Sequence, residues 1–360
     1  MEKGFRKTAV GLMSGTSLDG LDICYCEFRF DEKWEFEIKA AECIEYSDEL
    51  KEKLGSAHLQ SETELSILHF EFGQFIGEQT RTFLYSSNLP KPDLVCSHGH
   101  TVLHKPDKRI TLQVGDGQEI ANITGITCVN DFRSLDVSLG GQGAPLVPIG
   151  DELLFSEYDA CLNLGGFSNI SFTEDGERRA FDICPVNIVL NESANRLNHP
   201  FDINGEFAKS GKLNETLLDQ LNGLDLYVKE NRPSLAREWV ESAVSPLLKG
   251  ANLSEVDLLR TFVEHVAIQI ARVIEAKVAG GRVLITGGGA YNSFLMERMQ
   301  DYSLADLIIP DKQTIEFKEA LIFAFLGVLK SENEINVLRS VTGAKEDSCS
   351  GVIHQPILPT

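Results

Sequence analysis

Three apolar stretches open the chain and are separated by short polar turns. The first two, residues 8–14 and 21–30, are rich in aliphatic, aromatic and cysteine side chains, and residues 34–46 alternate apolar with charged positions. Runs of this length between turn-forming residues predict β-strands. Because the turns at 15–20 and 31–33 are short, we expect the three strands to form an antiparallel meander.

From residue 61 the apolar positions follow a helical spacing. Ser61 and Glu64 form a capping box, and Leu65, Leu68 and Phe72 lie on one face of the helix that they predict. This helix is expected to end near residue 88. The rest of the first half is predicted to hold a strand at 93–97, a histidine-rich loop at 98–106, a strand at 111–114, a helix from 119 and a strand at 126–129.

The second half repeats this order loosely. The predicted elements are strands at 158–164, 168–172 and 179–183, a helix at 255–278 capped by Ser254, a strand at 282–285, helices at 292–299 and 316–329, and a tail of loop and turn beyond 331.

Each half therefore begins with three strands and has a glycine turn after the first of them. We expect two α/β domains, 1–145 and 146–315, with the last helix and tail, about 316–360, joining the first. This plan resembles the actin-like, sugar-kinase and heat-shock ATPase group, in which two ribonuclease-H-like domains bind nucleotide and substrate in the cleft between them.

Charge and cysteine content narrow the class of protein. The net charge of −21 argues against nucleic acid or an anionic membrane as a partner. The eight cysteines include no Cys-x-x-Cys pair, which favours reduced thiols in a cytoplasm. Since no signal peptide or membrane-spanning run is visible, we expect a soluble cytoplasmic protein that binds small molecules.

The turn after the first strand has the composition of a phosphate-binding loop. Gly15 leaves room for backbone N–H groups to approach an anion, and Thr16 and Ser17 add hydroxyl donors. Asp19 can hold Mg²⁺ directly or through water. The loop lacks the Gly-Lys-Ser/Thr of a Walker motif. A hairpin whose turn residues serve only the backbone explains the pattern equally well.

Two further glycine loops follow apolar strands in the second half. Their candidate nucleotide-binding residues are Gly165, Gly166, Ser168, Asn169, Gly287, Gly288, Gly289 and Asn292. Together with the first loop they indicate a nucleotide held on three sides, and the third loop opens a helix whose N-terminus favours anions. Close packing of helix against strand is the alternative, and for the third loop alone it is favoured.

Other candidates carry acid, base or cationic side chains. Asp182 lies near a predicted strand end, where it could act as a general base or could simply cap a turn. Arg133 and Asp136 suit a sugar hydroxyl or carboxylate, or an interdomain ion pair. Glu319 begins an apolar helix, either as a ligand-binding carboxylate in the cleft or as an acid that interacts with the helix dipole.

Histidines 98, 100 and 104 form a His-x-His-x3-His run. A zinc site completed by Asp116 is one interpretation. Histidines that only form hydrogen bonds are favoured, because the sequence around this run offers no further residues that would orient metal ligands.

These motifs together resemble the anhydro-N-acetylmuramic acid kinases of bacterial cell-wall recycling. The resemblance runs nearly end to end through Gly11-Leu-Met-Ser-Gly-Thr-Ser-Leu-Asp-Gly-Leu-Asp22, Ser97-His-Gly-His-Thr-Val-Leu-His-Lys-Pro106, Gln113-Val-Gly-Asp116, Asp131-Phe-Arg133, Gly140-Gly-Gln-Gly-Ala-Pro-Leu-Val-Pro148, Asn163-Leu-Gly-Gly-Phe-Ser-Asn-Ile170, Phe181-Asp182, Gly287-Gly-Gly-Ala-Tyr-Asn292, Glu319-Ala320 and Val341-Thr-Gly-Ala344.

The resemblance implies an ATP- and Mg²⁺-dependent reaction on 1,6-anhydro-N-acetylmuramate. Water opens the anhydro bridge at the anomeric carbon, and the released O6 takes the γ-phosphate to give N-acetylmuramate 6-phosphate. By resemblance Asp182 activates the water, and His98, Arg133 and Glu319 lie where the sugar binds. The ATP-phosphate loop comprises Gly15, Thr16, Ser17, Leu18, Asp19, Gly20, Leu21 and Asp22. A homodimer is a further expectation from the family.

The chain departs from the family pattern in three places. Asp182-Ile-Cys-Pro-Val-Asn187 stands where Asp-Thr-Gly-Pro-Gly-Asn is usual, His100 stands where Gln is usual, and Asn231-Arg-Pro-Ser234 replaces a Lys-Ser/Thr-Thr-Gly-type segment. The lost glycines motivate a second hypothesis, a kinase of the same fold for another amino sugar. A third is a non-catalytic nucleotide or muropeptide sensor, which the retained Asp19 and Asp182 disfavour.

Overall fold

The computed structural model describes residues 1–227 and 235–357, which form two compact units. Unit 1 comprises Met1–Leu154 and Phe317–Thr360, and unit 2 comprises Phe155–Glu316. The chain leaves unit 1 after the helix α5 (Pro148–Leu154), later than the boundary expected at residue 145. The reason is that α5 packs against β3 and Gly150 contacts Ile322, both in unit 1.

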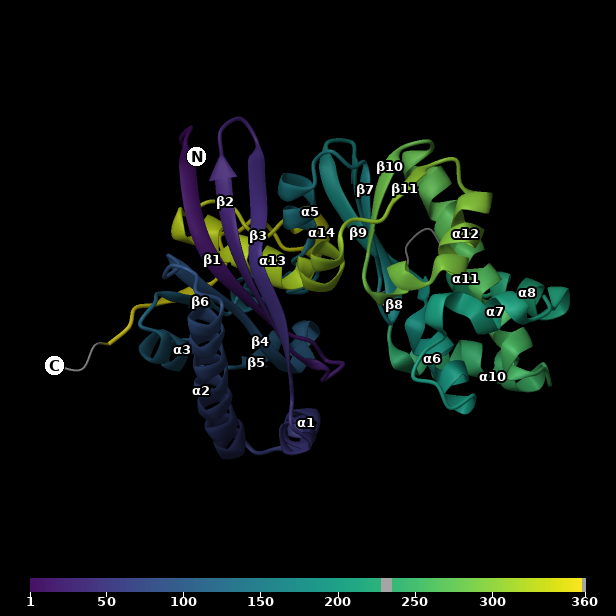
Figure 1. Cartoon of the computed structure of the whole chain (residues 1–360), viewed down its shortest axis with the longest axis horizontal. Coiled ribbons are helices and arrows are strands. Elements are labelled where there is room, and N and C mark those ends of the chain that lie inside the picture. The colour runs from purple at the N-terminus through teal and green to yellow at the C-terminus, as the bar shows by residue number, and fades with distance from the viewer. Residues whose placement is uncertain (228–234, 358–360) are drawn as a thin grey trace. The chain divides into compact units, whose positions relative to one another are not determined.

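Unit 1 is built on a seven-stranded sheet in the order β12-β6-β4-β1-β2-β3, with β5 paired to β4 (Figure 1). Its strands are β1 (Phe5–Ser14), β2 (Gly20–Phe30), β3 (Trp34–Glu45), β4 (Leu94–Lys105), β5 (Ile110–Val114), β6 (Cys128–Asn130) and β12 (Val352–His354). The first three form the predicted antiparallel meander, and β4 and β6 add to it in parallel.

Helices cover both faces of this sheet (Figure 1). The helix α2 (Glu62–Ser86) begins with the predicted capping box at Ser61 and buries Leu68 and Phe72 against one face, where it also packs on α3 (Gly117–Thr124). The helix α13 (Lys312–Ser331) packs on the other face. The shorter helices of unit 1 are α1 (Asp48–Gly55), α4 (Ser134–Ser138) and α14 (Arg339–Thr342), with 3₁₀ turns η1 (Ala57–Leu59) and η2 (Pro106–Lys108).

Unit 2 contains a five-stranded sheet in the order β11-β10-β7-β8-β9. Its strands are β7 (Ala160–Leu164), β8 (Phe167–Glu174), β9 (Glu177–Pro185), β10 (Arg282–Thr286) and β11 (Asp306–Ile308). Its helices are α6 (Asn187–Arg196), α7 (Glu206–Ser210), α8 (Glu215–Asn222), α9 (Arg237–Trp239), α10 (Ser245–Gly250), α11 (Glu255–Val278) and α12 (Ser293–Tyr302), with short turns η3 (Ile203–Gly205), η4 (Asp225–Tyr227), η5 (Val240–Val244) and η6 (Gly288–Tyr291). The long helix α11, capped by Ser254 as predicted, packs on β8 and β9.

The two sheets share one plan, which is three antiparallel strands followed by two that run parallel to the first. In unit 1 this order is β3-β2-β1-β4-β6, and in unit 2 it is β9-β8-β7-β10-β11. It is the strand order of ribonuclease-H-like domains, so the predicted class of two such α/β units is confirmed.

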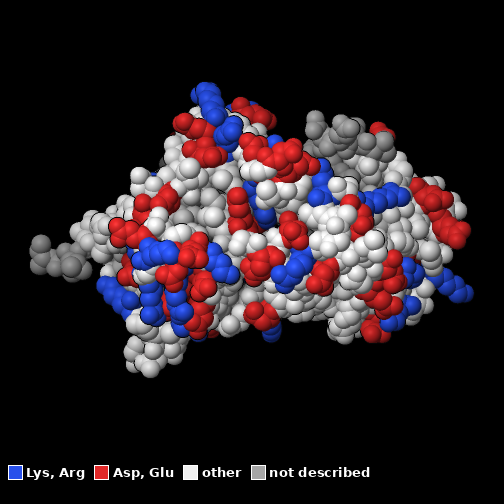
Figure 2. Space-filling model, turned by 90° about the horizontal axis from the view of Figure 1, so that it is seen from above, with Lys and Arg blue, Asp and Glu red and all other residues white. Residues whose placement is uncertain are grey.

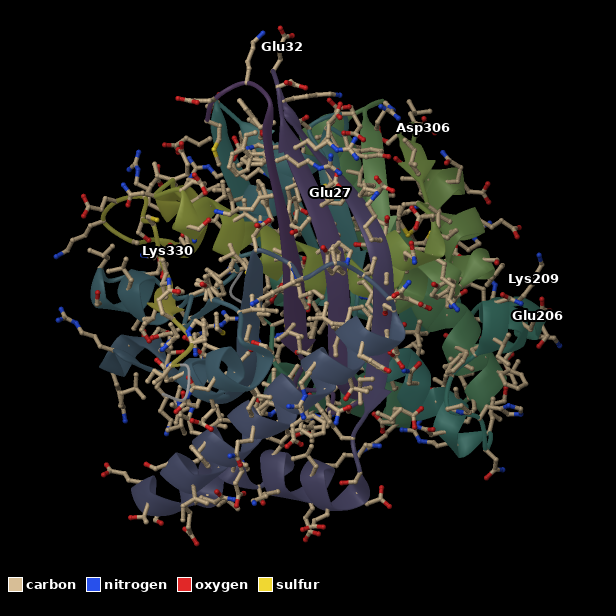
Figure 3. All side chains as sticks on the ribbon, turned by 60° about the vertical axis from the view of Figure 1, so that its left-hand side comes forward. Glu27, Glu32, Glu206, Lys209, Asp306 and Lys330 are labelled. Carbon is tan, nitrogen blue, oxygen red and sulfur yellow. The ribbon has the colours of Figure 1, made fainter. Side chains whose placement is uncertain are left out.

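Two predictions for unit 1 are wrong. Residues 98–106 are largely strand, because Gly99, at φ +70°, forms a bulge and β4 then continues to Lys105 in register with β5. The tail beyond residue 331 is also more than loop and turn, since it contains α14 and the edge strand β12, which pairs with β6. The Lys330 ammonium donates to the Cys349 carbonyl at 3.0 Å and holds this tail to the end of α13 (Figure 3).

Surface charges of both signs are intermixed on the face drawn in Figure 2. Within the described ranges, 1–227 and 235–357, none of the helices has an apolar run sufficient to span a lipid bilayer.

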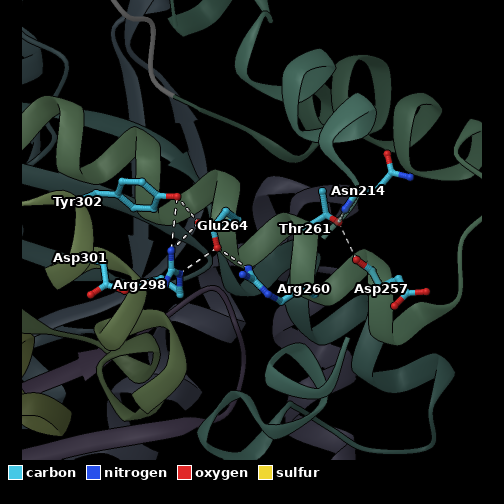
Figure 4. Close-up of polar contacts among 8 residues, drawn as sticks. All are labelled: Asn214, Asp257, Arg260, Thr261, Glu264, Arg298, Asp301 and Tyr302. Carbon is cyan, nitrogen blue, oxygen red and sulfur yellow. Dashed lines mark hydrogen bonds and ion pairs between the residues drawn. The ribbon is translucent and has the colours of Figure 1, made fainter. Parts of the chain in front are cut away.

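A buried ion cluster fixes α12 on α11 in unit 2 (Figure 4). Glu264, with 2% of its side chain exposed, accepts hydrogen bonds from Arg298 Nε at 3.0 Å and Nη2 at 2.9 Å, and it also bonds to Arg260 and Tyr302. A buried carboxylate is tolerated only while such partners remain. Because α12 follows the loop at 287–289, the cluster also fixes the base of that loop.

Replacing Glu264 with alanine should strongly destabilise unit 2. Removal of one partner from a buried ion pair leaves uncompensated charge, so we expect the free energy of unfolding to fall by about 3–5 kcal/mol. Urea unfolding, followed by Trp239 fluorescence in a Trp34→Phe background, measures the loss.

The matched control is Lys209→Ala, which removes the exposed pair that Lys209 forms with Glu297 at 3.1 Å. Because solvent already screens this pair, stability should hardly change. A Glu264→Ala loss no larger than that of the control would contradict the assigned role of the cluster.

Candidate active site

The loop between β1 and β2 keeps its polar side chains available. Thr16, Ser17 and Asp19 are exposed, and within the described chain neither hydroxyl has a hydrogen-bond partner. The Leu18 N–H donates to the Gly15 carbonyl at 3.3 Å, which closes a turn. The loop therefore presents two hydroxyls and a carboxylate on a short backbone arc, as a phosphate and its metal ion require.

Leu18 anchors this loop. Its φ of 61° lies in the left-handed region that a leucine seldom adopts, and its side chain packs against the core of unit 1 and near Gly55. Leu21 is 1% exposed, and a Cβ on Gly20 would lie 2.5 Å from the Ile44 carbonyl oxygen. The side chains of Leu18 and Leu21 and the missing Cβ of Gly20 thus shape the loop, and their predicted contact with ATP stays a prediction.

Two carboxylates lie near the Cys43 thiol at the base of the loop. Asp22 lies directly across the strands from Cys43, and partial burial, the hydrogen bond to Asp22 and the charges of Asp22 and Asp19 raise the pKa of the Cys43 thiol to about 12. Both carboxylates are therefore near one thiol. Mg²⁺ needs only one or two carboxylates beside phosphate and water oxygens, so this donor set fits that ion.

His98 and Arg133 form a buried hydrogen-bonded pair. Arg133 donates from Nε at 3.1 Å and from Nη2 at 2.8 Å to His98 Nε2, and from Nη1 at 2.6 Å to the Gly143 carbonyl. Burial and the charge of Arg133 hold the pKa of His98 well below its usual value, so the ring is neutral and its Nδ1–H donates to the Gly99 carbonyl at 2.8 Å. Both His98 nitrogens are thereby used within the protein.

Arg133 remains free to bind an anion. Its guanidinium has five N–H groups, of which these contacts use three. Burial lowers the pKa of Arg133 to about 10, while the charge of Glu319 acts in the opposite direction. The arginine is therefore still cationic at neutral pH, and two of its N–H groups have no partner in the described part of the chain and can serve a sugar oxygen or carboxylate.

Glu319 lies near Arg133 and Asp22, on α13. The residue is exposed to solvent on one side. Burial by the surrounding protein atoms raises the pKa of its carboxyl above the usual 4.5. The charge of Arg133 lowers this pKa, and the charge of Asp22 raises it further. Of the predicted sugar-binding residues, the structure thus groups Glu319, Arg133 and His98 in unit 1. Their contact with a sugar stays a prediction.

Asp136 has a structural environment. It is fully buried, and its carboxylate accepts hydrogen bonds from the Gly143 N–H and the Thr342 hydroxyl, both at 2.7 Å. A Cβ on Gly141 would lie 2.2 Å from this carboxylate. Asp136 therefore holds the glycine-rich segment in shape, and its predicted contact with the sugar remains untested.

The histidine run does not form the zinc site that was one interpretation. Nowhere in residues 1–227 and 235–357 do three His, Cys, Asp or Glu side chains gather as a metal site would need. The Gly99 bulge sends His98 to the α13 face, against Phe323, and His100 to the α2 face, against Phe72. His104 instead bonds to the Thr111 hydroxyl.

In unit 2 three polar residues form a row across β7, β8 and β9. Asn163 pairs with Asn169, and Asn169 pairs with Asp182. Asp182 is half-buried within β9, not at its end, and its Oδ2 accepts from the Leu235 N–H at 2.8 Å. Burial raises the pKa of Asp182 above its usual 3.8, while that backbone hydrogen bond lowers it. A carboxylate with one occupied oxygen and a raised pKa is suited to accept a proton.

The glycines of the three loops differ in whether a Cβ would fit at their positions. A Cβ on Gly287 or Gly289 would lie within 2.7 Å of Asn163 or Leu164, so backbone packing requires both. No such clash would arise at Gly15, Gly165, Gly166 or Gly288, where the nearest heavy atom lies 3.4 Å or more away and φ is not positive. Packing within the described chain does not explain these four glycines, whereas close approach of a ligand would.

Two residues predicted to bind nucleotide have hydrogen-bond partners within unit 2, and their contact with nucleotide stays a prediction. The Ser168 hydroxyl is fully buried and bonds to the Cys184 backbone carbonyl at 3.1 Å and N–H at 3.2 Å. The Asn292 side chain caps α12 by accepting from the Leu295 N–H at 3.0 Å. Asn169 is exposed beside Asp182, and its side-chain amide has no hydrogen-bond partner among the residues that the structure describes.

The altered residues after Asp182 turn away from that row. Ile183, Cys184 and Val186 are all fully buried in the core of unit 2. The departure from the family pattern is therefore accommodated inside the core, and this weakens its use as an argument for another substrate. The altered segment at 231–234 lies outside the described residues.

Sequence reasoning did not single out Asn163, Ser14 or Tyr46 as site residues, although the first two lie in the quoted motifs. Asn163 interrupts an apolar strand, which was a usable signal. Ser14 and Tyr46 hydrogen-bond to each other at 2.7 Å from different strands, and no spacing along the chain predicts that contact.

Comparison with known proteins adds independent findings. The sequence model described as anhydro-N-acetylmuramic acid kinase matches residues 7–356. The anhydro-N-acetylmuramic acid kinase of Hydrogenovibrio crunogenus is 32% identical, with 97% of this chain and 98% of that protein covered. That of Pseudomonas fluorescens is 33% identical, with 96% and 98% covered.

Solved structures that resemble this chain share little sequence with it. The (R)-2-hydroxyglutaryl-CoA dehydratase component A of Acidaminococcus fermentans has a TM-score of 0.47 and 12% identity, with 88% of this chain and 96% of that chain covered. A ROK family glucokinase from Streptomyces griseus has a TM-score of 0.38 and 11% identity, with 89% and 98% covered. The family match over nearly the whole chain, and the two curated relatives above 30% identity, show that this chain belongs to the anhydro-N-acetylmuramic acid kinase family.

Proposed function

We propose that this kinase opens the 1,6-anhydro ring of 1,6-anhydro-N-acetylmuramate with water and phosphorylates O6 in the same reaction, giving N-acetylmuramate 6-phosphate. The observation that carries the proposal is the set of four glycines, at 15, 165, 166 and 288, that packing within the described chain does not require. Gly15 lies in the loop that carries the exposed hydroxyls of Thr16 and Ser17, and the other three lie in the glycine loops of unit 2.

ATP would be held through its phosphates. The hydroxyls of Thr16 and Ser17 and the backbone at Gly15 suit the phosphate oxygens. When bound, Mg²⁺ would neutralise phosphate charge at Asp19 and Asp22. The remaining contribution of the protein to phosphoryl transfer is alignment of the acceptor oxygen with the γ-phosphate.

Asp182 would act as the general base. Its Oδ1, which has no hydrogen-bond partner among residues 1–227 and 235–357, takes a proton from water while the water oxygen forms a bond to the anomeric carbon. The bond from that carbon to O6 breaks, O6 forms a bond to the γ-phosphorus, and the bond from that phosphorus to ADP breaks. The proton held by Asp182 later passes to solvent, so no separate acid is required.

Arg133 would bind the sugar through its two unused N–H groups, with His98 fixing its orientation. Glu319 could accept a hydrogen bond from a sugar hydroxyl close by. The role of the kinase in peptidoglycan recycling, its cytoplasmic location and a homodimer belong to the same proposal and rest on the family alone.

The reaction in ¹⁸O-labelled water tests the proposed chemistry. Mass spectrometry of the product should find one label, on the anomeric hydroxyl, and none on the phosphate. A phosphorylated sugar without label, or faster turnover of a plain hexosamine, would favour a kinase of the same fold for another amino sugar.

Replacing Asp182 with asparagine should lower kcat by about 10²–10⁴-fold, because the amide cannot accept the proton. Product formation from the anhydro-sugar and ATP is the measurement. Asp175→Asn, at the tip of the same β8–β9 hairpin, is the matched control and should leave kcat unchanged. Full turnover by Asp182→Asn would refute the assigned base.

The rate should also depend on pH through Asp182. A base acts deprotonated, so kcat is fully developed above the folded-state pKa of Asp182 and is lost as pH falls through it. Because burial raises that pKa above 3.8, the acidic limb should lie at a higher pH than for an ordinary aspartate. A pH–rate profile measures it, and an unchanged limb in the residual activity of Asp182→Asn would assign the limb to another group.

Arg133→Lys should raise the KM for the sugar by roughly 10-fold or more. Lysine cannot bond to His98 and Gly143 and still offer a planar pair of donors to the substrate. Steady-state kinetics with each substrate varied in turn should show little change in the KM for ATP. Arg179→Lys, on exposed β9 surface, is the control. An increase confined to the KM for ATP would place Arg133 at the nucleotide instead.

A further inference from the structure

A buried chain of hydrogen bonds ends at the start of the predicted phosphate loop. Tyr46 Oη donates to Ser14 Oγ at 2.7 Å, and Ser14 Oγ lies 3.0 Å from His100 Nδ1. The side chains are 4%, 1% and 3% exposed, respectively. They come from three strand regions, the end of β3, the end of β1 and the middle of β4, so they meet only in the folded unit 1.

The direction of the hydrogen bonds follows from the available protons. Tyr46 donates to the Ser14 oxygen, which leaves the Ser14 hydroxyl hydrogen to be donated to His100. Burial lowers the pKa of His100, so its ring is neutral and Nδ1 can accept that hydrogen. All three groups are satisfied only when they remain together, because a buried hydroxyl without its partner is costly.

Ser14 is the last residue of β1, and its partner in the parallel register of β4 is His100. The next residue is Gly15, where the loop begins. Downstream, the loop is anchored by the buried contact of Leu18. Upstream, the direction of the backbone entering Gly15 depends on where the Ser14 side chain is held.

We propose that His100 and Tyr46 are positioning residues for the nucleotide, acting through Ser14 to fix the backbone that enters the phosphate loop. The proposal rests on the proposed function of residues 15–19 as that loop. Neither side chain touches the ligand. Their requirement is chemical, since position 100 needs a buried hydrogen-bond acceptor and position 46 needs a buried donor.

Nucleotide binding by four single variants and one double variant tests this. Tyr46→Phe removes only the donor, and His100→Leu removes only the acceptor. His100→Gln supplies an amide oxygen that can accept from Ser14. Phe72→Leu is the matched packing control, because the Phe72 ring contacts both Tyr46 and His100 without joining the hydrogen bonds.

The probe is MgADP, whose Kd is measured by calorimetry without sugar, together with the KM for each substrate in turnover. We expect Tyr46→Phe and His100→Leu each to raise the Kd for MgADP by roughly 5-fold to 10-fold, with the KM for the sugar unchanged. His100→Gln should bind as the parent does. The double variant Tyr46→Phe/His100→Leu should be little worse than either single variant, because both act through Ser14.

Several results would overturn the proposal. The proposal fails if Phe72→Leu weakens MgADP binding as much as the polar variants do, or if the KM values for both substrates rise together. Either result would indicate general destabilisation, and melting temperatures of every variant would show its extent. Independent, multiplying effects of the two substitutions would exclude action through one serine.

Failure of the positioning role can be distinguished from failure of the proposed function. If the parent binds MgADP with the expected dependence on Tyr46 and His100 but does not phosphorylate the anhydro-sugar, the positioning role stands and the substrate assignment fails. If the parent binds no MgADP, both proposals fail.

Discussion

The close approach of α13 to the sheet of unit 1 is the contact on which the rest of that unit depends. A Cβ on Gly11 would lie 1.8 Å from the Ala320 carbonyl, and one on Gly327 would lie 2.1 Å from Cys96 Sγ. These two glycines let the helix backbone lie almost on the strands β1 and β4. The same contact seats Phe323 against His98 and carries Glu319 close to Arg133. A residue with a side chain at Gly11 would therefore disturb the polar group as well as the core.

The Gly99 bulge places His98 and His100 of β4 on opposite faces of the sheet. With a regular strand, residues 98 and 100 would face the same side. The positive φ at Gly99 and the change of register place His98 with Arg133 on one face and His100 with Ser14 on the other. A Cβ at this position would lie 2.5 Å from the Val114 carbonyl oxygen, so the bulge needs glycine.

Sequence patterns gave good predictions where local signals were strong. The meander at the start of each unit has apolar runs and turn formers, and α2 and α11 have serine caps and a long apolar face. The length of β4 was missed because its histidines and lysine have no strand periodicity after the bulge. The strand β12, of three residues, has too few positions to show any period and exists only through pairing with β6.

Motifs located the polar groups but not the direction of each side chain. Loop composition pointed to Ser168 and Asn292, yet their side chains bond to the Cys184 backbone and the first turn of α12. Asp136 is likewise enclosed by Thr342, which is far away in sequence. Asp182 could be found from its motif, but its place in one row with Asn169 and Asn163 depends on strand register. The direction in which a side chain points depends on bulges and on long-range partners, which no short window of sequence contains.

Unit 1 is assembled from both ends of the chain, whereas unit 2 is one continuous segment. During synthesis on the ribosome, unit 2 can complete its fold once residue 316 has emerged. The meander of unit 1 is synthesised first but can be completed only after α13 and β12 have emerged. Until then the sheet face around Gly11 and Cys96 remains exposed to water. Chaperone demand and the risk of misassembly should therefore concentrate on the nascent N-terminal half, even though it is the oldest part of the polypeptide.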